Sequence, residues 1–151
     1  VSDPTLHPKF HELLAICIKK NRKVVVQTAV AVKPKIWWTK SFMMSIGREV
    51  EWIFAIDGLP KDSNKYRVNQ DGEKLYDIML RCASFGVKTQ WQYIVFNYNE
   101  KDVETCKSIA NEHGIKFLQI TSGRWGTEVL KSLQPSKDYS DISGVSVRKY
   151  T

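Results

Sequence analysis

The sequence predicts an α/β fold in which parallel strands alternate with helices. Two observations predict it. Apolar residues recur at helical spacing in several segments, and short apolar runs typical of strands buried in a parallel sheet lie between those segments. Glycine follows three of the four expected helices, where a left-handed residue ends a helix at low cost. Strands that alternate with helices of this length pair in parallel through right-handed crossovers.

The first half of the chain contains two helix–strand pairs. A helix over 10–18 follows Pro8, which suits a first-turn position. The run Val24-Val25-Val26 predicts a strand that is apolar, and therefore buried, on both faces. A second helix, over 37–46, ends before Gly47, and an apolar strand over 52–56 follows it. Turn residues Asp-Gly-Leu-Pro stop that strand.

The second half repeats the pattern after a long polar loop over 61–70. Asp71 is an N-cap for a helix that runs to Phe85 and that Gly86 closes. A strand over 91–96 leads into an exit loop at Asn97-Tyr98-Asn99. The last pair is a helix over 103–112, ended by His-Gly, and a strand over 115–120.

Two architectures satisfy this order of elements, an open doubly wound sheet and an arc of a (β/α) barrel. The barrel could not close, because the chain has too few strands. In both architectures, functional groups collect where the strands end. The expected strand ends carry Thr28, Asp57, Gly58, Asn97, Asn99, Thr121 and Ser122.

Composition and charge restrict the classes of function. No apolar run approaches the roughly 20 residues that span a bilayer, so no membrane partner is expected. The net charge of +7 admits nucleic acid as a partner, but the only dense basic cluster, 19–23, is better explained as a charged helix end. The three cysteines lie too far apart for a metal or redox motif, which predicts buried free thiols and a reducing, cytoplasmic location.

Several motifs, in this order, resemble those of radical S-adenosylmethionine (SAM) enzymes. They are the turn at 3–8, the pair Trp37-Trp38, the run 54–59 ending in Ile-Asp-Gly-Leu, the Tyr-Arg pair at 66–67, and Ile-Val-Phe-Asn-Tyr-Asn-Glu at 94–100. The resemblance extends to about residue 125 and is nearest to the type with an auxiliary-cluster, SPASM-like tail.

The resemblance implies a partial (β/α) barrel of the radical SAM type over 1–122 and an irregular tail over 123–151. In that family a four-iron four-sulfur cluster reduces SAM to a 5′-deoxyadenosyl radical. Three cysteines of a Cys-x-x-x-Cys-x-x-Cys loop hold the cluster, and no such loop exists in this chain. The resemblance places the missing loop just before Val1, so the metal ligands are expected outside the chain.

The resemblance also implies which residues contact SAM: Asp3, Pro4, Thr28, Asp57, Gly58, Arg67, Asn97 and Asn99. Asp3 and Pro4 lie at the family's turn near the SAM amino group, although Asp3 also suits a cap before Pro4. Thr28 matches a strand-end Thr. Arg67 suits a bidentate clamp on the SAM carboxylate.

At other positions the sequence departs from the family. Ala29 and Val30 replace polar and flexible residues, and Ala55 replaces a Ser that hydrogen-bonds SAM. Asp57 and Gly58 match, with Gly58 expected in a tight turn of positive φ and Asp57 either capping that turn or touching the ligand. Asn97 and Asn99 follow the strand whose exit faces adenine or substrate.

These observations predict a fragment of a radical SAM enzyme that acts with SAM and an external four-iron four-sulfur cluster on an unknown substrate, peptide or other. This chain alone is expected to be inactive, and no catalytic residue is assigned. The alternative is a degenerate barrel remnant that binds a nucleotide or nucleic acid without cluster chemistry. A doubly wound nucleotide-binding domain lacks support, because neither a Gly-x-Gly-x-x-Gly nor a P-loop follows any strand.

Overall fold

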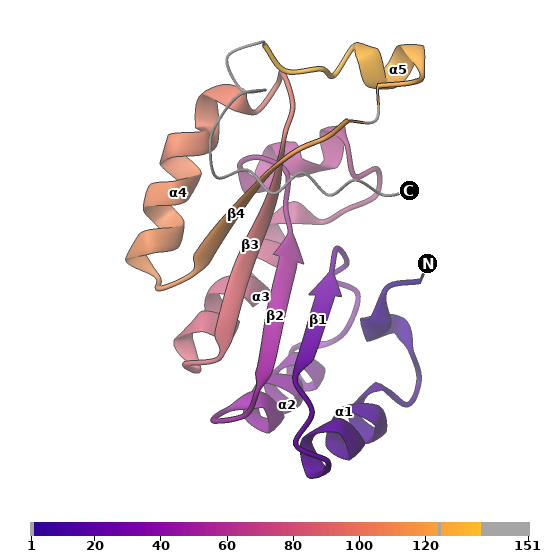
Figure 1. Cartoon of the computed structure of the whole chain (residues 1–151), viewed down its shortest axis with the longest axis vertical. Coiled ribbons are helices and arrows are strands. Elements are labelled where there is room, and N and C mark those ends of the chain that lie inside the picture. The colour runs from indigo at the N-terminus through magenta and orange to yellow at the C-terminus, as the bar shows by residue number, and fades with distance from the viewer. Residues whose placement is uncertain (1, 124, 137–151) are drawn as a thin grey trace.

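A computed structural model of the chain describes residues 2–123 and 125–136 (Figure 1). The helices and strands are η1 (Pro4–Leu6), α1 (Phe10–Lys19), β1 (Val24–Thr28), α2 (Lys35–Ser45), β2 (Val50–Ala55), η2 (Pro60–Lys65), α3 (Gly72–Ser84), β3 (Lys88–Val95), η3 (Glu100–Asp102), α4 (Val103–Glu112), β4 (Lys116–Thr121) and α5 (Glu128–Lys131). Within these residues, α1 to α4 and β1 to β4 alternate in the predicted order, whereas three short 3-10 helices (η) and α5, in the segment expected to be an irregular tail, were not predicted. Arg124 and most of the predicted tail, 137–151, lie outside the described residues.

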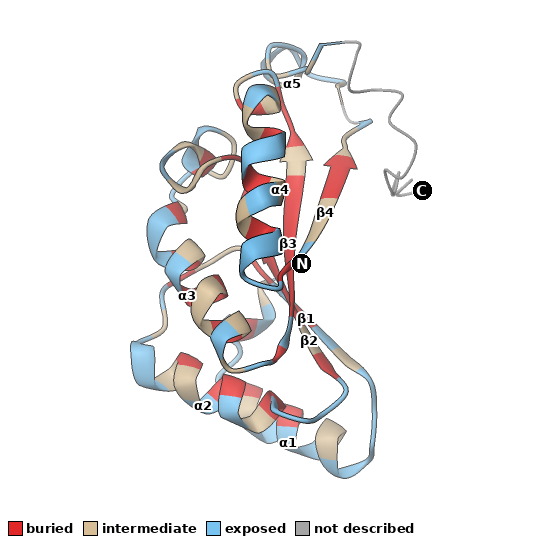
Figure 2. Ribbon diagram, turned by 90° about the vertical axis from the view of Figure 1, so that its left-hand side faces the viewer, coloured by how far each residue is buried: buried red, intermediate tan, exposed pale blue. Residues whose placement is uncertain are grey.

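The four strands form one parallel sheet in the order β1-β2-β3-β4. Each strand therefore pairs with the next one along the chain, and every crossover runs in the same direction. Right-handed crossovers in one direction place the intervening helices on one face of the sheet, as Figure 2 shows. A doubly wound sheet would have helices on both faces, so the arc of a barrel is the architecture that forms.

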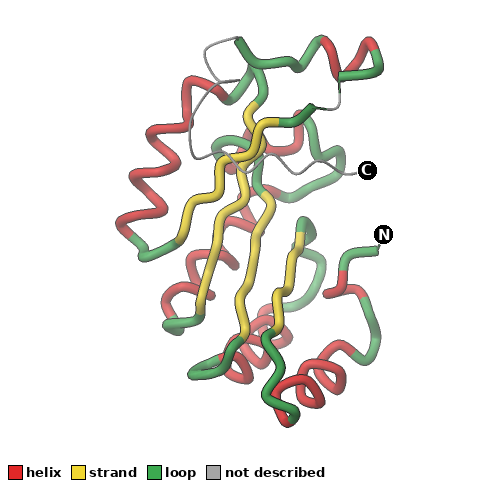
Figure 3. Tube along the Cα trace, in the orientation of Figure 1, coloured by secondary structure: helices red, strands yellow, loops and turns green. Residues whose placement is uncertain are grey.

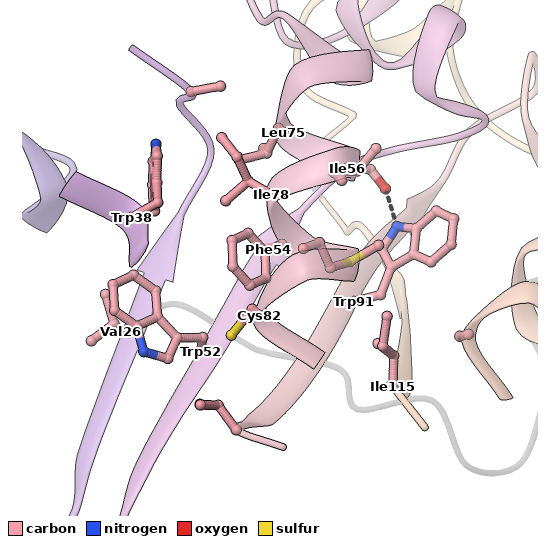
Figure 4. Close-up of a cluster of buried hydrophobic side chains, with 14 of the residues drawn as sticks. Val26, Trp38, Trp52, Phe54, Ile56, Leu75, Ile78, Cys82, Trp91 and Ile115 are labelled. Atoms are coloured by element: carbon pink, nitrogen blue, oxygen red, sulfur yellow. Dashed lines mark hydrogen bonds between the residues drawn. The ribbon is translucent and has the colours of Figure 1, made fainter. Parts of the chain in front are cut away.

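The core lies between the sheet and these helices (Figure 4). Alternate residues of β2 and β3 face the helices and are fully buried, among them Trp52, Phe54 and Trp91. The indole Nε1 of Trp91 donates a hydrogen bond to the carbonyl of Ile56 at 2.9 Å. Trp38 on α2 is equally buried, so the tryptophans pack the core as aromatic side chains usually do.

The face of the sheet opposite the helices corrects the expectation that the strand at 24–26 is buried on both sides. Val25 is 51% exposed, because β1 is an edge strand and none of the helices in the described residues packs on this side of it. The strand is therefore buried on one face only. On the same face the amide of Gln27 donates to that of Gln92 at 3.0 Å. The two side chains meet diagonally across β2, because Gln27 is opposite Ile53 and Gln92 is opposite Ala55.

The helix ends follow the predicted chemistry. The Asp71 carboxylate caps α3 by accepting a hydrogen bond from the Lys74 amide at 3.0 Å. The glycines after α2, α3 and α4 have φ of +67°, +73° and +65°, the left-handed conformation expected there. In the described residues, no helix is both long and apolar enough to cross a membrane.

The start of α3 packs against the loop after β2 more closely than a side chain permits. A Cβ placed on Gly72 would lie 2.1 Å from the carbonyl oxygen of Pro60, which is backbone and cannot swing away. Gly72 is therefore required by packing, and not by its backbone angles.

We predict that Gly72→Ala lowers the free energy of unfolding by about 1–3 kcal/mol, since the loop must shift to admit the methyl group. Gly126→Ala is the matched control, because nothing lies within 4 Å of its Cβ position. Urea denaturation followed by circular dichroism measures both. Equal stabilities of the two variants would contradict the close approach.

The cysteines differ in environment, which corrects the expectation that all three are buried. Cys82 and Cys106 are buried against the sheet, whereas Cys17 is half-buried. Burial raises the pKa of the Cys82 and Cys106 thiols to about 12, so both remain protonated near neutral pH. The thiolate is the reactive form of cysteine.

We predict that iodoacetamide at pH 8 modifies Cys17 alone in the native chain and all three cysteines in urea. Mass spectrometry of the alkylated protein counts the adducts, and peptide mapping locates them. Native labelling of Cys82 or Cys106 at the rate seen in urea would show that the helices do not cover them.

Candidate ligand pocket at the carboxyl edge of the sheet

The loops that follow β1, β2 and β3 meet at one edge of the sheet, because parallel strands end on the same side (Figure 3). This edge contains Thr28, Asp57 and Asn97, as predicted for the rim of a barrel arc. The short helix η1 lies beside it and is connected to the end of β1.

Asp57 is the most buried charged group at this edge, with no exposed surface. Its Oδ2 accepts a hydrogen bond from Arg67 Nε at 2.7 Å, and its Oδ1 accepts one from the Ile94 amide at 2.8 Å. Burial raises the pKa of the Asp57 carboxyl, and the Arg67 charge and the Ile94 amide oppose that rise. The carboxylate therefore has a cation and a backbone donor that compensate for its lost hydration.

The main chain of Asp57 is bound as well. Its amide donates to the Ser63 hydroxyl at 2.9 Å, and its carbonyl accepts a hydrogen bond from the Tyr98 hydroxyl at 2.9 Å. These bonds join the loop after β2 to the loop after β3. Gly58, the next residue, has a φ of +125°, which confirms the predicted turn, and a Cβ there would lie 3.3 Å from that of Asn99.

Arg67 uses only part of its guanidinium in this network. The Nε is bound to Asp57, while no described residue accepts a hydrogen bond from either Nη atom. The side chain is 21% exposed, and its guanidinium carbon lies 5.9 Å from the centre of the Tyr66 ring. Arg67 is thus held in one orientation with two nitrogens left for another acceptor.

A pocket of about 560 Å³ opens beside Arg67, between the loop after β1 and the loop after β2. Such a volume is within the range of pockets that hold drug-sized ligands, roughly 300–1,000 Å³. Its cations are Arg67 and Lys74, and Val32 and Val68 are strongly exposed apolar residues in its wall. The lining residues are Ala29, Val30, Ala31, Val32, Tyr66, Arg67, Val68, Asn69, Gln70, Asp71 and Lys74.

Gln70 connects the two loops that form the pocket. Its amide nitrogen donates to the carbonyls of Ala29 and Ala55, each at 2.9 Å, and its Oε1 accepts from the Ser63 hydroxyl. Neither Gln70 nor Ser63 is predicted by the sequence, because a polar loop has no periodicity that distinguishes a buried amide from a solvated one. The nearest signal is the length of that loop.

Asp3 and Thr28 lie together at the end of β1. Asp3 Oδ2 accepts hydrogen bonds from the Thr28 hydroxyl at 3.0 Å and the Ala29 amide at 2.8 Å. Asp3 Oδ1 accepts from the amide and hydroxyl of Thr5 at 3.0 and 2.6 Å, so Asp3 is also the cap before Pro4. Pro4 is exposed in the first turn of η1. None of these residues lines the pocket, although Ala29 does.

The two predicted asparagines do not face the pocket. Asn99 is fully buried, where its Oδ1 accepts from the Phe96 amide at 2.7 Å and its Nδ2 donates to the Ile94 carbonyl at 3.0 Å. Asn97 is exposed and donates to the carbonyl of Ser132 at 2.6 Å, beyond α5. Asn99 therefore shapes the strand exit, and Asn97 binds the segment after α5.

The described residues contain no group of three or more His, Cys, Asp or Glu that would hold a metal ion. The three cysteines lie on three different helices, α1, α3 and α4. They do not fit the close thiolate spacing that an iron–sulfur cluster requires.

No protein-family model and no curated protein matches the sequence. Solved structures do match the fold. Streptococcus suis SuiB bound to S-adenosylmethionine superposes with a TM-score of 0.71 at 11% identity, covering 89% of this chain and 31% of SuiB. SuiB bound to the precursor peptide SuiA gives a TM-score of 0.68 at 13% identity, covering 91% of this chain and 30% of SuiB.

The chain thus spans about a third of the length of SuiB. The likeness confirms the predicted fold class, an α/β arc of a (β/α) barrel in which parallel strands alternate with helices.

We predict that Asp57→Asn lowers the free energy of unfolding by about 2–4 kcal/mol, because it leaves Arg67 without its partner and gives the Ile94 amide a weaker acceptor. Asp62→Asn is the control. It breaks a pair with Lys65, which is half exposed, and should cost at most about 1 kcal/mol. Thermal and urea denaturation compare the two, and similar losses would show that the buried pair has no special role.

Proposed function

We propose that this chain is the SAM-binding part of a radical SAM enzyme. The observation that carries the proposal is Arg67, whose orientation Asp57 fixes while two of its nitrogens remain available beside a pocket at the carboxyl edge. The fold supports it, since a SuiB structure of the same fold has S-adenosylmethionine bound. The SPASM-like type and the division at residue 122 remain predictions.

The pocket has groups for two parts of SAM, its carboxylate and its adenosyl part. The Nη atoms of Arg67 would bind the carboxylate in a bidentate way, and Lys74 adds a second positive charge nearby. Val32 and Val68 offer apolar surface to the uncharged adenosyl part. Gln70 holds the two walls together, so the pocket is formed before ligand arrives and less conformational entropy is lost on binding.

The residues of this chain do not fit the four-iron four-sulfur cluster, so their own contribution is limited to binding and orienting SAM. In the proposed enzyme, thiolates from outside the chain would hold the cluster. These residues also do not identify the substrate. A SuiB structure contains a precursor peptide, which makes a peptide the first substrate class to test.

A second candidate is a barrel remnant that binds a nucleotide or nucleic acid without cluster chemistry. Ala55 favours it, because this residue is 1% exposed at the end of β2 and has no hydroxyl where the family places a SAM-binding Ser. The same pocket would then take an adenine nucleotide in place of SAM. Affinity for the amino-acid part of SAM separates the two candidates.

We predict that Arg67→Ala weakens SAM binding by about tenfold or more, the loss expected for a charged hydrogen-bonded pair. Isothermal titration calorimetry of the whole chain measures it. Decarboxylated SAM provides the matching change in the ligand. It should bind the wild type as weakly as SAM binds the variant, and the Arg67→Ala variant should not discriminate between the two ligands.

Lys65→Ala is the control variant, because Lys65 lies in the same loop but outside the pocket. It should leave SAM affinity unchanged. Equal binding of SAM by wild type and Arg67→Ala would remove Arg67 from the site. Tighter binding of ATP than of SAM would favour the second candidate.

A further inference from the structure

A second hollow, of about 330 Å³, lies between α2 and α3 on the helical face of the molecule. Trp38 and Ile78 form its apolar floor. Four cationic side chains surround it and a single acidic residue, Asp77, faces them. The cations are Lys33, Lys35, Lys74 and Arg81. We call this hollow with its cations the α2–α3 groove.

The cations of the α2–α3 groove have no carboxylate partners. None of the four forms an ion pair with any described residue, and Asp77 forms none with them. Their contacts are with uncharged groups. The Lys33 ammonium lies 5.5 Å from the centre of the Trp37 ring, and Arg81 donates a hydrogen bond to the Thr39 hydroxyl at 2.8 Å.

One cation of the α2–α3 groove, Lys33, contributes to the pKa of a neighbouring side chain, although less than burial and less than Lys40, which lies outside the groove. Burial, together with the charges of Lys40 and Lys33, lowers the pKa of His11, which contacts α2 through a hydrogen bond to Ser41. Unpaired like charges around one hollow repel each other and therefore favour an anionic occupant.

The apolar floor selects among anionic partners. Trp38 is 1% exposed, so its ring cannot stack with a base, and stacking is the main source of affinity for single-stranded nucleic acid apart from charge. The slot suits an aliphatic side chain, because the methylene stems of the surrounding lysines extend its apolar walls. A peptide that carries apolar and acidic residues at helical spacing presents both features together.

We propose that the α2–α3 groove docks an acidic amphipathic peptide segment, with an apolar side chain in the slot and carboxylates on the four surrounding cations. Lys74 also lines the ligand pocket beside Arg67, so a docked segment would extend to the mouth of that pocket. Docking requires neither SAM nor a cluster. The docking proposal is therefore independent of the proposed function and is tested separately.

The test is fluorescence anisotropy of the whole chain with a fluorescein-labelled synthetic peptide in which Glu and Leu recur at helical spacing. The variant Lys35→Glu/Arg81→Glu should weaken binding by at least about tenfold, since it reverses two charges at the groove. Lys35→Glu alone, at an exposed position, should give part of this loss even if the Arg81 change disturbs folding.

The matched control is Lys19→Glu/Lys101→Glu, which changes the net charge equally at two exposed positions away from the groove. It should change the affinity less than about twofold, as expected for charges far from the site under salt screening. A peptide of the same composition with Glu and Leu segregated should bind more weakly to the wild type.

Three results would overturn the proposal. Equal loss in the control variant would show attraction to net charge alone. Tighter binding of a labelled oligothymidylate that depends on Lys35 and Arg81 would assign the groove to nucleic acid. Failure of the wild type to bind the amphipathic peptide more tightly than the segregated one would exclude the apolar slot.

Discussion

The carboxyl edge of the sheet depends on the buried carboxylate of Asp57. A carboxylate without exposed surface is costly unless each oxygen has a partner, and here Arg67 Nε and the Ile94 amide supply them. One partner comes from the loop after β2 and the other from β3, so the carboxylate determines how these elements meet. Its own main chain is bound by Ser63 and Tyr98, which leaves Asp57 little freedom to move.

The pocket follows from this constraint. Ser63, which binds Asp57, also bonds to Gln70, and Gln70 reaches the last carbonyl of β2 and the first residue after β1. Ala29 in turn bonds to Asp3. Hydrogen bonds therefore run without a break from Asp3 to Asp57 across the ends of two strands. A wall fixed in this way can present Arg67 to an anion without the reorganisation that weakens binding.

Short-range patterns in the sequence predict the helices and strands, whereas the arrangement of the pocket residues depends on contacts between segments that are distant in the sequence. Hydrophobic periods and residues such as Asp71 mark helices and strands because they act over a few residues. These periods contain no information on strand order, and therefore none on the exposure of Val25, which follows from the place of β1 at the edge of the sheet. Asp57 and Arg67 were both predicted, but as separate ligand contacts. Their mutual ion pair depends on how a loop folds back, which no spacing encodes.

The positions of the cysteines limit what chemistry the chain can contain by itself. Cys82 and Cys106 face the sheet from α3 and α4, on the side of the strands that the helices cover, and Cys17 lies on α1. Bringing three thiolates to one cluster would require these helices to leave the core that Trp52 and Trp91 fill. Recognition of a carboxylate by Arg67 requires no such change. In the proposed function, the residues of this chain therefore bind and orient SAM, and thiolates from outside the described residues hold the reducing cluster.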